Sequence, residues 1–164
     1  MQSFIGTFEH NLDAKNRLFV PAKFREDLGG HFLIKAVVSE YPCIECFCKD
    51  DYDTATEEAL SAVADPTIRR MRRFAAYAGT SDATVDAQGR IPIPSKIAQI
   101  AGLTKETLIV GMGDHVEIWN PATFDAYFAH VTENYMAQEA ASESEEKLSL
   151  ERKAAGAYLP GGEE

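Results

Sequence analysis

Residues 13–23 read DAKNRLFVPAK and residues 86–96 read DAQGRIPIPSK, so one pattern occurs twice in the chain. The Asp, Ala, Arg, Pro and Lys positions are identical at a constant offset of 73 residues, and most other positions match in kind. The agreement continues in the same order, with small insertions, as far as Tyr52-Asp53 and Phe124-Asp125. A co-linear match of this length indicates an internal duplication of one structural unit.

Both copies predict the same order of elements: a strand, a tight turn, a short strand, a short helix, a two-stranded hairpin and a closing helix. The expected strands span about residues 4–12, 18–20, 32–38 and 44–48 in the first copy and 80–85, 91–93, 107–110 and 116–119 in the second. Pro21 and Pro94 open the short helices, since proline suits the first helical position. Neither copy has enough apolar surface to fold alone, so we expect the two to interlock into one β-rich α+β barrel with pseudo-twofold symmetry and flanking helices.

These elements divide the chain into four segments. Residues 1–66 are the first repeat, residues 67–79 form a linking helix after the break at Asp65-Pro66, and residues 80–138 are the second repeat. Residues 139–164 are rich in Ser and Glu and end in Gly and Pro, which predicts a flexible acidic tail.

Composition favours a soluble globular protein, with 45% hydrophobic and 26% charged residues. Without an apolar run of ~18 residues or a signal pattern, we expect a cytoplasmic protein with no membrane partner. The net charge of −10 argues against nucleic acid, but eight of the acidic residues follow position 132, against three basic ones. Basic residues instead gather in residues 15–25 and in the RRMRR run at 69–73, so a local basic face is compatible with net acidity.

The Asp-x-x-x-Arg turns are the strongest functional signal. Asn16 and Gly89 hold the same place in the two turns, and these residue types best tolerate a positive φ. Arg17 and Arg90 would offer planar, multi-donor groups to phosphates or guanine edges, with an aspartate orienting each of them. The alternative is a purely structural ion pair, in which aspartate and arginine neutralise each other.

Other site chemistries fit the residues poorly. An aspartic-protease dyad is unfavourable, because Ala follows each Asp and the Arg four residues on would keep the carboxylate ionised. Cys43, Cys46 and Cys48 have no second ligand cluster and the four histidines are scattered, so the cysteines are interpreted as small buried hydrophobes with free thiols. No cofactor or catalytic motif is present, and we therefore predict no enzyme activity, cofactor, metal ion or small-molecule substrate.

The RRMRR run has two interpretations, a DNA-contacting stripe or, more favoured, a solvated or subunit-pairing face. In a helix, the arginines would fan outward while the apolar residues face the protein. These inward residues would be Ile68, Met71, Phe74 and Ala75.

The opening FIGxxxHxLDxKxRLxVPAKFR at residues 4–25 resembles the MraZ family. The RRF at 72–74, the DxxGRIxIP at 86–94 and the AGL at 101–103 resemble it too, and the similarity covers about residues 3–138. The resemblance implies an AbrB-like swapped-hairpin barrel formed by the two halves of one chain. It also implies assembly into a ring-like homo-oligomer and regulation of the division and cell-wall gene cluster, including the protein's own promoter.

The resemblance assigns DNA contacts to Arg17 and Arg90, with Lys15 beside the first. Two positions depart from the family pattern: Asn16 replaces the usual glycine, and Gln88 stands where the first copy has Lys15. The expected DNA-contacting residues are Lys15, Arg17, Lys23, Gln88 and Arg90, and the residues that shape the turns are Asp13, Asn16, Asp86 and Gly89.

The expected partner is double-stranded DNA in the nucleoid, bound at direct repeats in a promoter. The first copy carries a charge of +3 over residues 13–25 and the second +1 over 86–98, so the first is expected to contribute more affinity. The alternative function is an assembly or antidote-type module that holds a protein partner and binds DNA secondarily.

Overall fold

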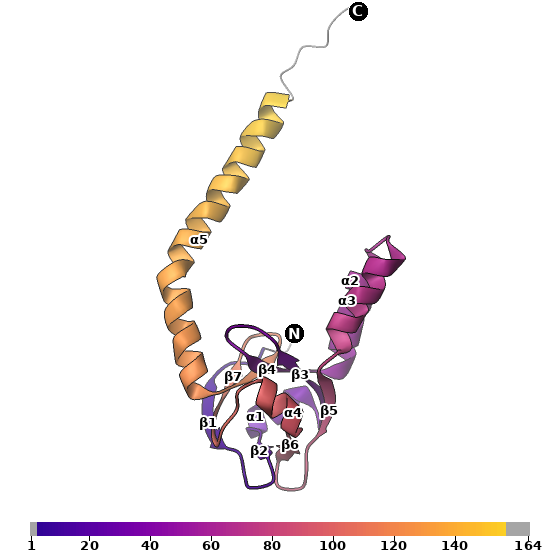
Figure 1. The fold of residues 1–164 in the computed structure, drawn as a ribbon, viewed down its shortest axis with the longest axis vertical. Coiled ribbons are helices and arrows are strands. Elements are labelled where there is room, and N and C mark those ends of the chain that lie inside the picture. Colours follow the sequence, from indigo (N-terminus) through magenta and orange to yellow (C-terminus); the bar gives the residue numbers. More distant parts are fainter. Residues whose placement is uncertain (1–2, 157–164) are drawn as a thin grey trace, which may run out of the picture. The chain divides into compact units, whose positions relative to one another are not determined.

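The structure, a computed structural model, describes residues 3–156 (Figure 1). The described residues form two compact units that divide after Phe124. The elements of the chain are β1 (Thr7–Asn11), β2 (Arg17–Phe19), α1 (Ala22–Leu28), β3 (His31–Val37), β4 (Cys43–Phe47), α2 (Lys49–Ser61), α3 (Pro66–Tyr77), β5 (Thr80–Thr84), β6 (Arg90–Pro92), α4 (Ser95–Ile100), β7 (Glu106–Gly111), β8 (Val116–Trp119) and α5 (Pro121–Gly156). None of the helices within this described range is long and apolar enough to cross a membrane.

The strands of the two copies pair with each other. An antiparallel six-stranded sheet has the order β1-β7-β8-β4-β3-β5, and β2 pairs with β6 in a second, two-stranded sheet. Leu18 lies opposite Ile91, and Glu45 lies opposite Glu117, and both pairs join equivalent positions of the duplication. A pseudo-twofold axis therefore passes through both pairs, and the two halves interlock as expected for units that cannot fold separately.

The ladders do not close into the barrel that the sequence predicts. Among the described strands, β1 pairs only with β7 and β5 only with β3, so the six-stranded sheet keeps two edges. The strands β2 and β6 follow the tight turns and are three residues long, and they pair with each other rather than with those edges. The fold is a mixed, strand-rich α+β arrangement with an open sheet.

One hydrophobic core connects the two copies. Leu18 and Ile91 of the short strands are fully buried, as are Phe24 of α1 and Ala101 after α4. The Phe24 ring packs edge-on against the rings of Phe4 and Phe8, with centroids 6.0 and 5.3 Å apart. Each short helix thus buries an apolar i, i+4 face, formed by Phe24 and Leu28 in the first copy and by Ile97 and Ala101 in the second.

The cysteines are free thiols, and two of them are buried, as the sequence analysis expects. Cys46 belongs to the main core, which it enters from β4. Cys43 lies on the other face of the sheet, in a smaller apolar cluster with Val110 and Trp119.

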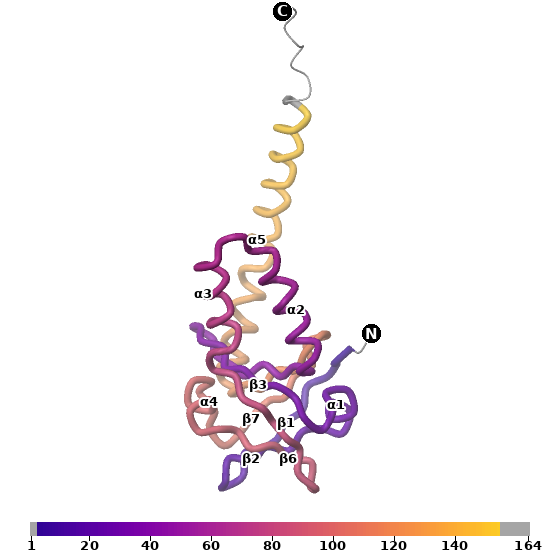
Figure 2. The backbone as a smooth tube through the Cα atoms, turned by 90° about the vertical axis from the view of Figure 1, so that its right-hand side faces the viewer, coloured from indigo at the N-terminus to yellow at the C-terminus, as the bar shows by residue number. Residues whose placement is uncertain are grey.

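The helices α2 and α3 form an antiparallel hairpin that Figure 2 shows side by side. Arg73 of α3 forms an ion pair with Glu57 of α2, and the Tyr77 hydroxyl donates a hydrogen bond to Asp53 at 2.8 Å.

The apolar side of α3 faces outward, so the predicted orientation of this helix is wrong. Its exposed residues include Ile68, Met71 and Phe74, with 45%, 67% and 75% of their surfaces accessible. The side of α3 that faces α2 carries polar contacts of Arg73 and Tyr77, and no residue of α3 is buried.

The helix α5 closes the second copy and extends into the segment that is expected to be a flexible tail. The Asn120 side chain accepts a hydrogen bond from the Ala122 amide at 2.9 Å, and Pro121 takes the first helical position. The helix continues to Gly156, so residues 139–156 of the segment expected to be a flexible tail are helical. No Gly or Pro interrupts residues 122–155, and Ala, Glu and Lys favour a helix. The remaining residues of that tail, 157–164, lie outside the described range.

Candidate functional site

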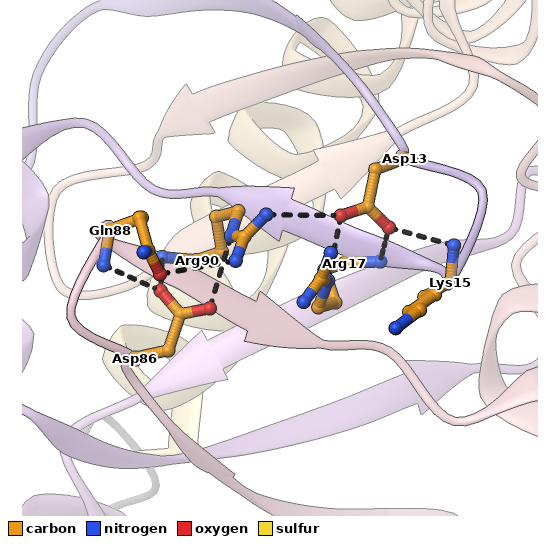
Figure 3. A network of polar contacts seen from close by, with 6 residues as sticks. All are labelled: Asp13, Lys15, Arg17, Asp86, Gln88 and Arg90. Atoms are coloured by element: carbon orange, nitrogen blue, oxygen red, sulfur yellow. Dashed lines mark hydrogen bonds and ion pairs between the residues drawn. The ribbon is translucent and has the colours of Figure 1, made fainter.

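The two Asp-x-x-x-Arg turns lie beside each other at the end of the first unit that is remote from the α2–α3 hairpin (Figure 1). The antiparallel pairing of β2 with β6 places Arg17 and Arg90, which begin the two strands, at opposite ends of the ladder, and the two turns stay close because each strand is only three residues long. Figure 3 shows the resulting network of polar contacts between six residues of the turns, which includes backbone amides as well as side chains.

The Asp13 carboxylate organises the first turn. Its Oδ1 accepts hydrogen bonds from the Lys15 and Arg17 amides, both at 2.9 Å, and its Oδ2 accepts one from Arg17 Nε at 2.7 Å. The Asp13 amide donates to the Arg17 carbonyl at 3.0 Å. One aspartate therefore closes the turn and orients the arginine, which an ion pair at the surface alone would not do.

The Asp86 carboxylate does the same in the second turn. Its Oδ1 accepts from the Gln88 and Arg90 amides at 2.9 and 3.0 Å, and its Oδ2 accepts from Arg90 Nε at 3.0 Å. The duplication thus repeats the contacts atom by atom, and the shared Asp and Arg of the motif have the same roles in both copies.

These contacts hold both carboxylates in the charged form. The backbone hydrogen bond from Arg17 is the largest cause of a lowered pKa at Asp13, and the backbone hydrogen bond from Arg90 is the largest cause at Asp86. A lowered pKa means that the contribution of these groups to stability is present above their ordinary pKa near 4 and is lost as the pH falls further. At neutral pH the turns are therefore fully formed.

The two arginines differ in how many of their nitrogens are engaged. All three Arg90 nitrogens have partners: Nε binds Asp86, Nη1 lies 3.5 Å from Asp13 Oδ2, and Nη2 donates to Gln88 Oε1 at 3.1 Å (Figure 3). Within the described residues, Arg17 contacts a carboxylate only through Nε. The two terminal amino groups of Arg17 are thus available to a ligand, whereas those of Arg90 are engaged, Nη1 by Asp13 of the other copy and Nη2 by Gln88 of its own turn.

The residues at positive φ also join the copies. Asn16 has a φ of 54° and Gly89 a φ of 81°, the left-handed conformation that the sequence predicts for both positions. The Asn16 carbonyl accepts from the Ile93 amide at 2.8 Å, and the Gly89 carbonyl accepts from the Val20 amide at 2.9 Å. Each turn therefore anchors the strand that leaves the other turn.

A substitution at Gly89 should cost more stability than one at Asn16. A Cβ atom at Gly89 would lie 2.9 Å from Arg25 Cζ and 3.0 Å from Phe19 Cε2. We expect Gly89→Ala to lower the free energy of unfolding by about 1–2 kcal/mol, because a left-handed residue with a side chain is strained. Asn16→Gly should change it by less than about 0.5 kcal/mol, since glycine accepts this φ at least as well. Urea denaturation of the two variants measures the difference, and equal effects would contradict the expectation.

The remaining predicted residues occupy different places. Lys15 and Gln88 are exposed at the tips of the two turns, where the sequence analysis puts them. Lys23 lies on α1, and its Nζ donates to the Ile5 carbonyl at 3.3 Å, so it is outside the network of the turns.

Arg25 belongs to the site, although the sequence analysis does not select it. Its Nε donates to the Val20 carbonyl at 2.8 Å, and its guanidinium lies over the Phe19 ring, 5.4 Å from the centroid. It approaches Gly89 so closely that this first-copy arginine lies beside the second turn. A comparison of the two copies could have pointed to Arg25, because the equivalent position in the second copy is the buried Ala98 and the positive charge of Arg25 has no counterpart there.

One group of metal-ligating side chains exists elsewhere in the described part of the chain. Glu45, His115 and Glu117 bring one ligand atom each within 4.8 Å of one another, on β4 and at the start of β8.

Comparison with known proteins gives matches over most of the chain. A family model described as "MraZ protein, putative antitoxin-like" matches residues 3–74 and 76–146. A protein named Transcriptional regulator MraZ from Desulforamulus reducens is 34% identical over 134 residues, which cover 80% of this chain and 92% of the relative. Proteins of the same name from Lachnoclostridium phytofermentans and Acetivibrio thermocellus are 34% and 33% identical, over 75% and 76% of this chain and 85% of each relative.

Proposed function

The chain belongs to the MraZ family, whose curated members are named transcriptional regulators and not enzymes, and from this premise we propose that its paired turns form a sequence-specific DNA-binding surface. The observation that carries the proposal is the Arg17 guanidinium, which Asp13 holds through Nε while the terminal amino groups stay available. A guanidinium held in this way loses little freedom when it binds a guanine edge or a phosphate.

The surroundings of the turns support a site for an anionic partner. Lys15 lies two residues before Arg17, and Arg25 lies beside the second turn. The net charge of −10 belongs largely to other parts of the chain, because residues 13–25 carry +3. A local positive field of this kind attracts DNA even when the whole protein is acidic.

The pairing of the copies supports an AbrB-type arrangement of the chain and an operator that consists of direct repeats. Each turn is anchored by the other copy, which is the relation that a swapped-hairpin arrangement of the AbrB type requires. In a ring of identical chains the turns would repeat in the same sense, and the operator would therefore consist of direct repeats. We propose that this operator lies upstream of the protein's own gene, within a division and cell-wall gene cluster in the nucleoid.

A DNA-binding assay with designed operators tests this function. Fluorescence anisotropy with DNA from the upstream region should give saturable binding, and two direct repeats about one helical turn apart should bind more tightly than one repeat. The affinity should fall as salt rises, because neutralised phosphates release counterions. The control is the same DNA with the second repeat inverted. Undiminished affinity for a single repeat would contradict the arrangement, and an absence of binding at low salt would contradict the function.

The protein is also expected to form a homo-oligomer larger than a dimer. Ile68, Met71 and Phe74 form an exposed apolar stripe on α3, and such stripes mark protein contacts. Light scattering after gel filtration should give several times the chain mass of 18.1 kDa. The double variant Met71→Glu/Phe74→Glu should lower this mass, since it places charges on the stripe. A wild-type monomer at micromolar concentration would contradict the expectation.

The same stripe supports the second candidate, an antidote-type module that holds a protein partner. The description of the matching family model as antitoxin-like points in the same direction. The turns and α3 lie at different ends of the first unit (Figure 1), so Arg17→Ala should weaken DNA binding without changing the mass, and Met71→Glu/Phe74→Glu should abolish binding of a protein partner without changing the turns.

A further inference from the structure

A polar cluster lies on the face of the sheet opposite the main core. Side chains alternate along a strand, so residues two apart share a face. On β4, Ile44 and Cys46 enter the main core, whereas Cys43 and Glu45 do not. At β8, Val116 and Ile118 enter the core, whereas His115, Glu117 and Trp119 lie on the same side as Cys43 and Glu45.

The duplication explains how these groups meet. The segments Cys43-Ile44-Glu45 and His115-Val116-Glu117 occupy equivalent positions in the two copies. Glu45 is paired with Glu117 across the β4–β8 ladder, on the pseudo-twofold axis. The axis therefore brings two carboxylates together from opposite strands, with a thiol on one side and an imidazole on the other.

The three closest groups point toward one another. His115 Nε2 lies 3.3 Å from Glu117 Oε2 and 3.4 Å from Glu45 Oε2, and the three ligand atoms are mutually within 4.8 Å. Their side chains are 12–24% exposed, so the cluster is held by its surroundings and still open to ions. The Cys43 Sγ lies 3.7 Å from Glu117 Oε2.

The surroundings orient these groups as they would around a metal ion. His115 Nδ1 lies 2.6 Å from Asp114 Oδ1, which leaves Nε2 directed at the two glutamates. The imidazole stacks on the Phe47 ring, and Trp119 Nε1 donates to Glu117 Oε1 at 3.2 Å. A carboxylate on one ring nitrogen of a histidine, with the other nitrogen free for the ion, is the usual second layer of contacts at a metal centre.

Two carboxylates this close to each other favour positive charge between them. A divalent cation held by Glu45, His115 and Glu117 would supply that charge.

We propose that Glu45, His115 and Glu117 bind one divalent transition-metal ion that joins the two copies of the duplication. Zn²⁺ is the best fit, because imidazole and carboxylate ligands suit it, whereas Mg²⁺ and Ca²⁺ prefer oxygen ligands alone. The Cys43 thiol is the adjacent donor for a fourth position. The site is separate from the turns, and its proposal does not depend on DNA binding.

Binding of Zn²⁺ to the full-length, untagged and reduced protein tests the proposal. Competition with a chromophoric chelator should give one ion per chain, and excess Mg²⁺ should not displace it. His115→Gln should weaken binding by about tenfold or more, since even the loss of a group behind a ligand has effects of 10- to 100-fold. The matched control is His31→Gln, which removes a histidine 3.4 Å from the Asp82 carboxylate and should leave Zn²⁺ binding unchanged.

Two further variants keep the result decisive. Glu45→Gln removes a ligand and retains a hydrogen-bond acceptor, so it gives the answer if His115→Gln fails to fold by circular dichroism. Zn²⁺ should also raise the melting temperature of the wild-type protein and of His31→Gln, but not that of Glu45→Gln. Less than one ion per chain, binding that is unaffected by both ligand variants, or binding that is lost on Cys48→Ser instead would overturn the proposal.

Discussion

Replacing Arg17 by alanine is expected to weaken operator binding by about 1–3 kcal/mol, or roughly 5- to 150-fold, while the protein stays folded. The Arg17 side chain forms a polar contact only with Asp13 among the described residues, and the backbone contacts of the turn remain in the alanine variant, so the substitution should have little effect on stability. The terminal amino groups that it would offer to DNA are lost completely. Fluorescence anisotropy with operator DNA measures the loss, and circular dichroism checks the fold.

Arg90→Ala is the matched comparison, because Arg90 holds the equivalent position in the second copy. We expect a smaller loss of DNA affinity, since the three Arg90 nitrogens are engaged by Asp86, Asp13 and Gln88. We expect a larger loss of stability for the same reason, because Arg90 links the two turns. Lys15→Ala should weaken binding to all DNA sequences and reduce the salt slope by about one unit.

Two results would contradict this division of roles. A larger loss of DNA affinity in Arg90→Ala than in Arg17→Ala would mean that the second turn reads the operator. Unfolding of Arg17→Ala would mean that the Asp13–Arg17 pair is structural, which is the alternative that the motif by itself leaves open.

Leu18→Ala is expected to lower the free energy of unfolding by about 2–5 kcal/mol, the largest effect on stability among the changes considered. Leu18 is fully buried and lies opposite Ile91 on the pseudo-twofold axis, so the cavity would open where the two copies meet. Both turns are anchored to β2 and β6, and their relative position should therefore loosen as well. Guanidinium denaturation at a fixed protein concentration measures the change.

Val38→Ala is the control, since Val38 is 84% exposed and its truncation should change stability by no more than about 0.5 kcal/mol. A cost at Leu18 below about 1 kcal/mol would mean that the neighbouring strands collapse into the space. The shared core at β2 and β6 would then contribute little to the union of the copies.

The predictable part of the site is the part that is local in sequence. The Asp13–Arg17 and Asp86–Arg90 contacts span four residues, and the left-handed backbone at Asn16 and Gly89 follows from the residue types. The spacing of residues along the chain does not predict which residues of one copy contact residues of the other. The proximity of Arg25 to Gly89 depends on the way in which the halves interlock.

The orientation of α3 shows the same limit. Its periodicity predicts an amphipathic helix correctly, and the helix spans Pro66–Tyr77 close to the expected range. Periodicity does not tell which face is covered, however, and here Arg73 and Tyr77 contact α2 while the apolar stripe is exposed. The structure also differs from the prediction at residues 139–156, which belong to helix α5, because a polar composition resembles that of a flexible tail even where helix propensity is high.

The duplication, the elements of each copy, the two turns and the residues that close them follow from the amino-acid sequence, because short-range sterics and hydrogen bonds establish these features. Three features depend on how the copies pack: the sheet stays open, Arg90 bridges the turns while Arg17 remains available, and Glu45, His115 and Glu117 meet on the axis. The physical reason is the pairing of β2 with β6 and of β4 with β8, which sets residues 73 and 72 positions apart in the chain opposite each other.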